Sequence, residues 1–165
     1  MMRLFYSILL SIFITSCGVY SFTGASIPLE AKTISVSYFK NKAATVQASL
    51  SQVFTERLKD VVLEQTNLEI TEYEGDLSFS GYISKYQIKP IAITANETAA
   101  KNRLTISIKV KYNNSFDSKK SFEQTFSRYQ DYDSNENLSS IENTLIEEIT
   151  NEIAEDVFNK AFVNW

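Results

Sequence analysis

The order of hydrophobic periodicities constrains this chain more than any other feature. One alternating stretch is followed by a stretch with helical spacing, three further strand-like stretches come next, and a second helical stretch ends the chain. Spacings of three and four residues line one side of a helix, whereas strict alternation gives a strand one buried face. Elements with a single apolar side are satisfied in two layers. The sequence therefore predicts an α+β domain over residues 32–165, a two-layer sandwich in which two helices pack on one face of a four-stranded mixed sheet in the order β-α-β-β-β-α.

The strand predictions rest on which residues alternate. Residues 32–39 form a first strand that buries Ile34, Val36 and Tyr38, and residues 68–73 form a short strand or a connection. The next run buries Leu77, Phe79, Gly81 and Ile83, and leaves Ser78, Ser80, Tyr82, Ser84 and Tyr86 on the opposite side. Residues 103–112 give the cleanest alternation, and residues 122–132 form its hairpin partner.

Both helices are predicted from an apolar stripe. The first stripe is Val46, Leu50, Val53, Phe54, Leu58, Val61 and Val62. Either Thr45 or the box Ser49-x-x-Gln52 would cap this helix, which ends near residues 66–67. The second stripe is Ile141, Leu145, Ile149, Ile153, Val157 and Ala161, and the box Ser139-x-x-Glu142 would cap it.

The start of the chain predicts an export signal. Arg3 precedes a short apolar run that is too short to span a bilayer, and Ile14-Thr15-Ser16-Cys17 has the layout of a lipoprotein cleavage site. We therefore expect residues 1–16 to be removed, and Cys17 to carry an N-acyl group and an S-diacylglycerol as the anchor. Residues 17–31 would then tether the domain. The alternative is an ordinary cleaved leader followed by an unpaired, buried cysteine.

Composition excludes several classes of function. The chain has no histidine, one cysteine and four glycines, so histidine-based catalysis, histidine metal ligands and glycine-rich nucleotide loops are not expected. It carries 16 basic and 20 acidic residues, which argues against nucleic-acid binding. We predict no enzyme activity, no metal and no cofactor apart from the covalent lipid. One weak catalytic alternative is a glycosidase-like pair formed by Asp131 and Asp133.

In a two-layer domain, the side of the sheet opposite the helices needs an explanation. Small hydroxyls and tyrosines can hydrogen-bond a polar wall such as the lumen of an outer-membrane β-barrel, and tyrosine is enriched at interfaces. The ordinary alternative is a solvated sheet face. The residues that we expect to face a barrel are Tyr82, Tyr86, Thr105, Ser107, Lys109, Thr125 and Ser127.

Several segments resemble the LptE family of lipopolysaccharide-assembly lipoproteins. They are residues 17–24, Pro28, residues 32–34, residues 102–104, residues 122–128 and residues 158–165. The resemblance implies two helices over a four-stranded mixed sheet, no catalytic residues, and a role as the plug of the LptD barrel that aids its assembly. It also implies binding of lipopolysaccharide and its delivery to the outer leaflet. The protein would then be anchored to the outer membrane and would face the periplasm and the barrel lumen.

No motif of that family transfers a lipopolysaccharide contact to a particular residue. Charge alone favours cationic clusters for lipid A phosphates. The candidates are Lys101, Arg103, Lys119 and Lys120, although each also fits a solvated turn. A competing function is a periplasmic lipoprotein scaffold of another envelope assembly, such as a secretion or efflux machine, because fold and lipid anchor fit both.

Overall fold

The computed structural model describes residues 27–91 and 100–163. The helices and strands run β1 (Thr33–Val36), β2 (Lys40–Asn41), α2 (Leu50–Gln65), β3 (Glu69–Thr71), β4 (Leu77–Ile91), β5 (Lys101–Asn114), the 3₁₀ turn η1 (Ser118–Lys120), β6 (Phe122–Asp133) and α3 (Leu138–Phe162).

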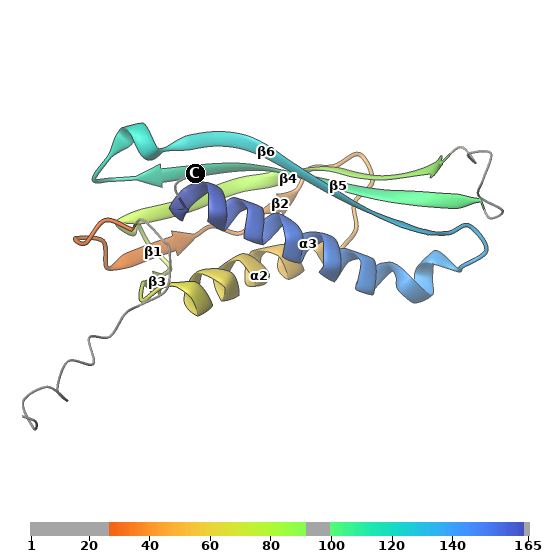
Figure 1. Cartoon of the computed structure of the whole chain (residues 1–165), viewed down its shortest axis with the longest axis horizontal. Coiled ribbons are helices and arrows are strands. Elements are labelled where there is room, and N and C mark those ends of the chain that lie inside the picture. The colour runs from red at the N-terminus through yellow and green to blue at the C-terminus, as the bar shows by residue number, and fades with distance from the viewer. Residues whose placement is uncertain (1–26, 92–99, 164–165) are drawn as a thin grey trace, which may run out of the picture.

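Both helices lie on one side of a single mixed sheet, which confirms the predicted α+β layers (Figure 1). The strand order is β3-β1-β4-β5-β6, and β2 also pairs with β4. β1 pairs in parallel with β3 and β4, whereas β4, β5 and β6 form an antiparallel meander. The sheet has six strands rather than four, because the short pieces β2 and β3 pair as well.

The predicted first strand is interrupted, and its register changes there. Tyr38 was expected inside but is 56% exposed, whereas Phe39 is fully buried. The Phe39 backbone N–H donates to the Thr55 hydroxyl at 3.1 Å, and its ring meets Phe54 edge-on at 5.0 Å. These contacts with α2 replace strand pairing at this point, so β1 and β2 are separate strands.

Both helices begin with caps other than the predicted ones. Gln47 accepts hydrogen bonds at its Oε1 from the backbone N–H groups of Ser49 and Leu50, so α2 begins at Leu50 and Val46 stays 67% exposed. Asn137 accepts from the Ser139 N–H and caps α3. The two capping boxes and the inclusion of Val46 were therefore wrong, because a neighbouring amide side chain satisfies the first turn in each case.

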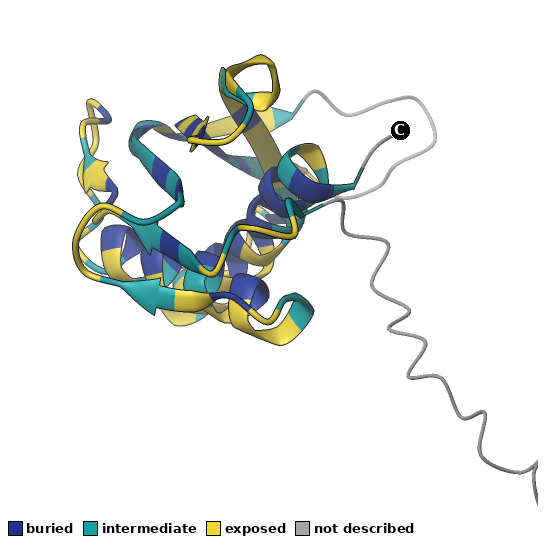
Figure 2. Cartoon of the chain, turned by 90° about the vertical axis from the view of Figure 1, so that its left-hand side faces the viewer, coloured by how far each residue is buried: buried dark blue, intermediate teal, exposed yellow. Residues whose placement is uncertain are grey.

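The core fills the space between the sheet and the helices (Figure 2). Its aromatic centre joins strands and C-terminal helix: the Phe162 ring meets Phe79 at 6.0 Å, Tyr112 at 5.6 Å and Phe158 at 5.0 Å. Edge-on and tilted ring contacts of this kind add to the stability gained from apolar burial. Among the described residues, neither helix combines the length and apolar character needed to cross a membrane.

Candidate functional site

The surface of β4, β5 and β6 that points away from the helices is called the free face below. Within the described part of the chain, no helix covers it (Figure 1). Its side chains lie in rows that cross the three strands. Three successive rows are Tyr82–Lys109–Thr125, Lys85–Ser107–Ser127 and Gln87–Thr105–Tyr129. The structure thus brings together Tyr82, Thr105, Ser107, Lys109, Thr125 and Ser127, six of the seven residues predicted to face a barrel.

The seventh, Tyr86, lies on the other side. The pairing of β4 with β5 shifts between Ile83 and Lys85, so Tyr86 aligns with Ile106 of the core. Tyr86 is 6% exposed, and its hydroxyl donates to the Glu142 carboxylate of α3. A β-bulge adds one residue to a strand and reverses the side on which later residues point. The placement of Tyr86 on the free face was therefore wrong.

Two polar groups of the free face are already engaged with each other. The Ser107 and Ser127 hydroxyls lie 2.9 Å apart, and Ser107 is 6% exposed. The Ser107 carbonyl also accepts from the Ser84 hydroxyl at 3.1 Å, at the bulge. Ser107 therefore supports the face from within, and Thr125, Ser127 and Tyr129 are more accessible to a partner.

The cation at the centre of the face is paired. The Lys109 Nζ lies 2.5 Å from the Glu123 carboxylate, and this hydrogen bond raises the pKa of Lys109 and lowers the pKa of Glu123. On the other side of β4, the Lys42 ammonium lies 4.6 Å from the centre of the Tyr82 ring. Both cations can turn to an anionic ligand only by giving up these contacts.

The four cations proposed for lipopolysaccharide do not form one cluster. Lys101 and Arg103 lie at the start of β5, whereas Lys119 and Lys120 lie in η1 beyond its other end. β5 has 14 residues, which at the rise of an extended strand is about 45 Å. A single lipid A head group is too small to contact both ends.

Arg103 is also held in place by its neighbours. Its Nε and Nη2 donate to the Asp131 carboxylate at 2.7 and 2.8 Å, and its guanidinium lies 3.6 Å from the centre of the Tyr129 ring. The hydrogen bond from Arg103 lowers the pKa of Asp131. A glycosidase acid needs a raised pKa, so this environment argues against the Asp131–Asp133 pair.

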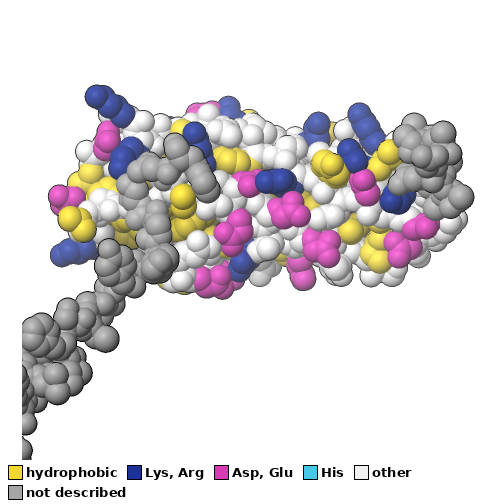
Figure 3. Space-filling model, viewed as in Figure 1, with side chains coloured by type: hydrophobic (Ala, Val, Ile, Leu, Met, Phe, Trp, Pro, Cys, Tyr) yellow, Lys and Arg dark blue, Asp and Glu magenta, His cyan; other side chains and the backbone are white. Residues whose placement is uncertain are grey.

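Two lysines that the sequence did not place on this face lie there, Lys85 and Lys89, and Lys111 lies on it as expected from alternation. Lys85 and Lys89 were missed because of the bulge. Without it, strict alternation from Tyr82 would place both side chains on the core side. Together with Lys101, Arg103 and Lys109 these three lysines make six cations against the carboxylates Glu123, Asp131 and Asp133, an excess of three positive charges. The two helices carry nine acidic and three basic residues. Figure 3 shows acidic side chains gathered over the helices.

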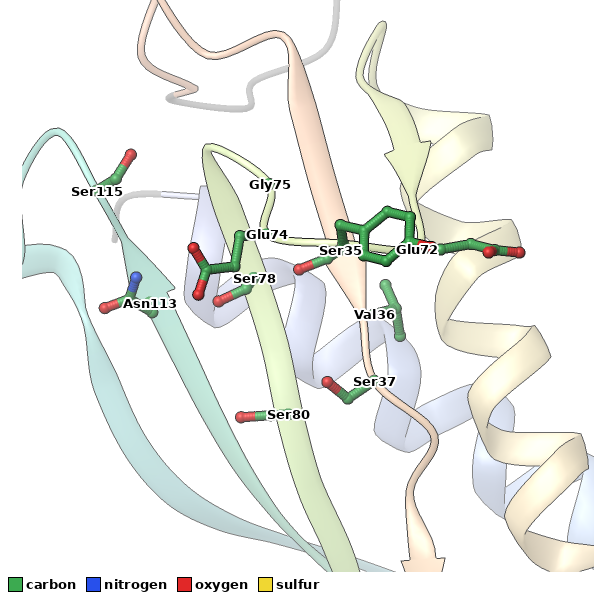
Figure 4. A pocket seen from close by; sticks show the side chains of 11 residues that line it. Ser35, Val36, Ser37, Glu72, Glu74, Gly75, Ser78, Ser80, Asn113 and Ser115 are labelled. Carbon is green, nitrogen blue, oxygen red and sulfur yellow. The ribbon is translucent and has the colours of Figure 1, made fainter.

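A polar cleft of about 680 Å³ hollows one end of the same side of the sheet. Serine hydroxyls from β1 and β4 form its floor, with Ser35 in register with Ser78 (Figure 4). The segment that connects β3 to β4 borders it with Glu72, Tyr73 and Glu74, and Tyr73 is 83% exposed. Hydroxyls, carboxylates and an open aromatic ring suit a hydroxyl-rich ligand such as a sugar. Within residues 27–91 and 100–163, no three metal-ligating side chains lie together.

One known protein family matches most of this chain. The family model "LptE: Lipopolysaccharide-assembly" matches residues 31–161. No curated protein matches the chain.

Solved structures with a similar fold share little sequence. One is a minor lipoprotein from Acinetobacter baumannii, with 12% identity and a TM-score of 0.51, covering 79% of this chain and 91% of its own. Another is a hypothetical protein from Chlamydia trachomatis, with 8% identity and a TM-score of 0.54, covering 81% and 99%. These likenesses concern the fold, whereas the family model covers most of the sequence. The chain belongs to the LptE family of lipopolysaccharide-assembly proteins.

Proposed function

We propose that this protein is a lipid-anchored component of the outer membrane that docks through its free face inside an LptD-like β-barrel, helps that barrel assemble, and assists transport of lipopolysaccharide to the outer leaflet. The observation that carries the proposal is the family match over residues 31–161. Membership of a lipopolysaccharide-assembly family supports this role, and the free face offers a surface for it.

The character of the free face supports a polar partner. Hydroxyls, tyrosines and charged groups recur along three long strands, so this face offers hydrogen-bonding groups to a partner. The lumen of an outer-membrane barrel is lined by polar side chains that can accept such contacts. A face with an excess of positive charge would also be drawn to an acidic wall.

Two parts of the same surface suit different parts of lipopolysaccharide. Lys85, Lys89 and Lys111 would attract lipid A phosphates, because ammonium groups form strong charge-assisted hydrogen bonds with phosphate. Glu72 and Glu74 would repel phosphates but accept hydrogen bonds from sugar hydroxyls. We therefore assign phosphates to the lysines and sugars to the cleft.

The membrane anchor belongs to the proposal. Cys17 and the predicted cleavage site at residues 16–17 lie outside the described residues. Acylation of Cys17 by several chains would hold the domain stably, since a single chain gives only marginal membrane binding. Replacing Cys17 by Ser should abolish attachment of the acyl chains, and the mass of the mature protein measures this.

Isolation of the tagged, lipid-anchored protein from detergent-solubilised membranes tests the proposal. We expect a stable complex with one large β-barrel, identified by mass spectrometry. Replacing Lys85 and Lys89 together by Glu should weaken binding of labelled lipopolysaccharide to this complex. The matched control replaces Lys32 and Lys59, which lie off the free face, by Glu. A protein that runs alone, or that accompanies a secretion or efflux assembly without a barrel, would overturn the proposal.

A further inference from the structure

β6 ends the sheet, and its outer edge has no strand beside it among the described residues. One step beyond the β5–β6 ladder, the Ser134 N–H donates to the Ala100 carbonyl at 3.0 Å. In an antiparallel pair, alternate residues bond to the same neighbour, so the even-numbered residues of β6 bond to β5. The odd-numbered residues in its middle therefore direct their backbone N–H and C=O groups away from the sheet: Thr125, Ser127, Tyr129 and Asp131.

This edge lacks the features that usually protect edge strands. Natural edges are blunted by prolines, bulges, short length or free charges. β6 has 12 residues, no proline and no lysine, and its register with β5 is continuous. Three of its four charged side chains form ion pairs within the protein: Glu123 with Lys109, Asp131 with Arg103, and Arg128 with Asp156. The edge is long and its pairing with β5 is unbroken, and most of its charges are neutralised within the protein.

A hollow of about 400 Å³ lies between β6 and α3, on the helix side of this edge. Its walls are Gln124, Asp156, Asn159 and Lys160, and the buried ring of Phe126 contributes to its lining. Arg128 and Gln130 hold α3 beside β6 through hydrogen bonds to Asp156 and Glu152. A strand added to β6 would place alternate side chains on this side, with one of them over the hollow.

We infer that the outer edge of β6 and the hollow beside α3 accept an extended segment of another polypeptide, which adds to the sheet as a further antiparallel or parallel strand. In this mode the backbone supplies the hydrogen bonds, and a side-chain pocket supplies the selectivity. The hollow suits a side chain with an apolar stem and a hydrogen-bonding end, because it combines an aromatic ring with two amides, a carboxylate and an ammonium group.

A second copy of this chain is a poor occupant. Pairing β6 with β6 around a twofold axis would bring the two α3 helices together. α3 carries six acidic residues and one lysine, so two copies would repel each other. The negative charge of α3 also favours an incoming segment that has no net negative charge.

The inference goes beyond the proposed function and does not depend on it, since any envelope protein with such a segment could supply the strand. Hydrogen exchange tests it on the lipid-anchored protein, alone in detergent and in the assembly isolated from membranes. We expect the backbone amides of Thr125, Ser127, Tyr129 and Asp131 to exchange at least about tenfold more slowly in the assembly, because strand pairing protects amides from opening.

A matched pair of variants separates strand addition from simple coverage. Thr125→Pro removes an N–H that points outward, at an edge position where proline is tolerated, whereas Thr125→Ala removes only the side chain. Thr125→Pro should lower recovery of the assembly at least about tenfold relative to Thr125→Ala, because both variants lose the same side chain on the free face and only the proline loses the outward N–H. Asn159→Trp, which fills the hollow from α3 and leaves β6 intact, should also lower recovery; circular dichroism checks that each variant folds.

Three results would overturn the inference. The four amides could exchange equally fast in both samples, the proline and alanine variants could assemble equally well, or the protection could come with a doubled mass of this chain alone. A barrel complex with unprotected amides would overturn this inference and leave the proposed function standing. Protected amides in an assembly without a barrel would support this inference and overturn the proposed function.

Discussion

The Tyr86 hydroxyl donates a hydrogen bond to the Glu142 carboxylate, and this contact joins β4 to the start of α3 across the interface between the layers. Burial, and then the hydrogen bond to Glu142, raise the pKa of Tyr86. The phenol therefore stays protonated and remains a donor at physiological pH. The contact exists because the bulge after Ile83 turns Tyr86 toward the helices.

Replacing Tyr86 by Phe should lower the free energy of unfolding by about 1–2 kcal/mol, because a carboxylate at the layer interface would lose its donor. Urea denaturation of the protein measures this. Tyr129→Phe on the free face is the control and should change stability by less than about 0.5 kcal/mol. Equal stability of the Tyr86 variant and the parent protein would show that this hydrogen bond does not stabilise the fold.

Replacing Gly81 by Ala should destabilise the protein by about 2–4 kcal/mol. Gly81 has a φ of +153°, and a Cβ there would lie 2.0 Å from the Lys109 carbonyl oxygen and 2.8 Å from the Phe39 ring. The strand and the Phe39 ring would both have to move. Ser80→Ala on the same strand is the control, and a thermal scan that gives the two variants the same midpoint would contradict the prediction.

Asp76 should stabilise the fold at neutral pH and not in strong acid. Its Oδ2 accepts from the Lys32 and Thr33 backbone N–H groups at 2.9 and 3.0 Å, and these bonds lower its pKa below the ordinary 3.8. A carboxylate with a lowered folded pKa contributes stability above its unfolded pKa, and this contribution is lost as the pH falls through the folded pKa. The Asp76→Asn variant should therefore be less stable than the parent at pH 7, and the difference should shrink below about pH 3.8. Chemical denaturation across this range measures the difference, and a gap that stays constant with pH would contradict the assignment.

Reversing the charge of Lys85 and Lys89 should weaken binding of lipopolysaccharide by at least about tenfold, given the usual contribution of roughly 1 kcal/mol for each lysine near an anionic lipid surface. The loss should shrink in high salt, because exposed charges are screened. Replacing Lys119 and Lys120 by Glu tests the sequence-based candidates at the far end of β5 in the same assay. If reversing the charges of one pair leaves lipopolysaccharide binding unchanged, that pair does not contact the lipid.

The layers could be predicted because periodicity decides which side of each element is buried. Ile34, the β5 alternation and the stripe of α3 all lie as predicted, since those elements are long or regular. Prediction failed where one residue changes the phase. Because of the bulge after Ile83, Lys85 lies on the free face where Tyr86 was predicted. Because of the break before Phe39, Phe39 is buried in the core where Tyr38 was predicted.

The site was harder to predict for the same reason. Hydroxyls on β5 and β6 could be assigned to the free face by alternation alone. Whether a cation there is available depends on neighbours that are distant in sequence: Arg103 is held by Asp131, and Lys109 by Glu123. Contact of the remaining residues with a barrel stays a prediction, as does lipid attachment at Cys17.

Photo-crosslinking in living cells tests the central claim most directly. A photoreactive residue at Lys111, exposed on the free face, should crosslink the protein to an LptD-like barrel, and the same residue at Glu148, exposed on α3, should do so with lower yield. Failure of the Lys111 position to crosslink to any barrel, in cells where the protein is anchored and abundant, would contradict the account.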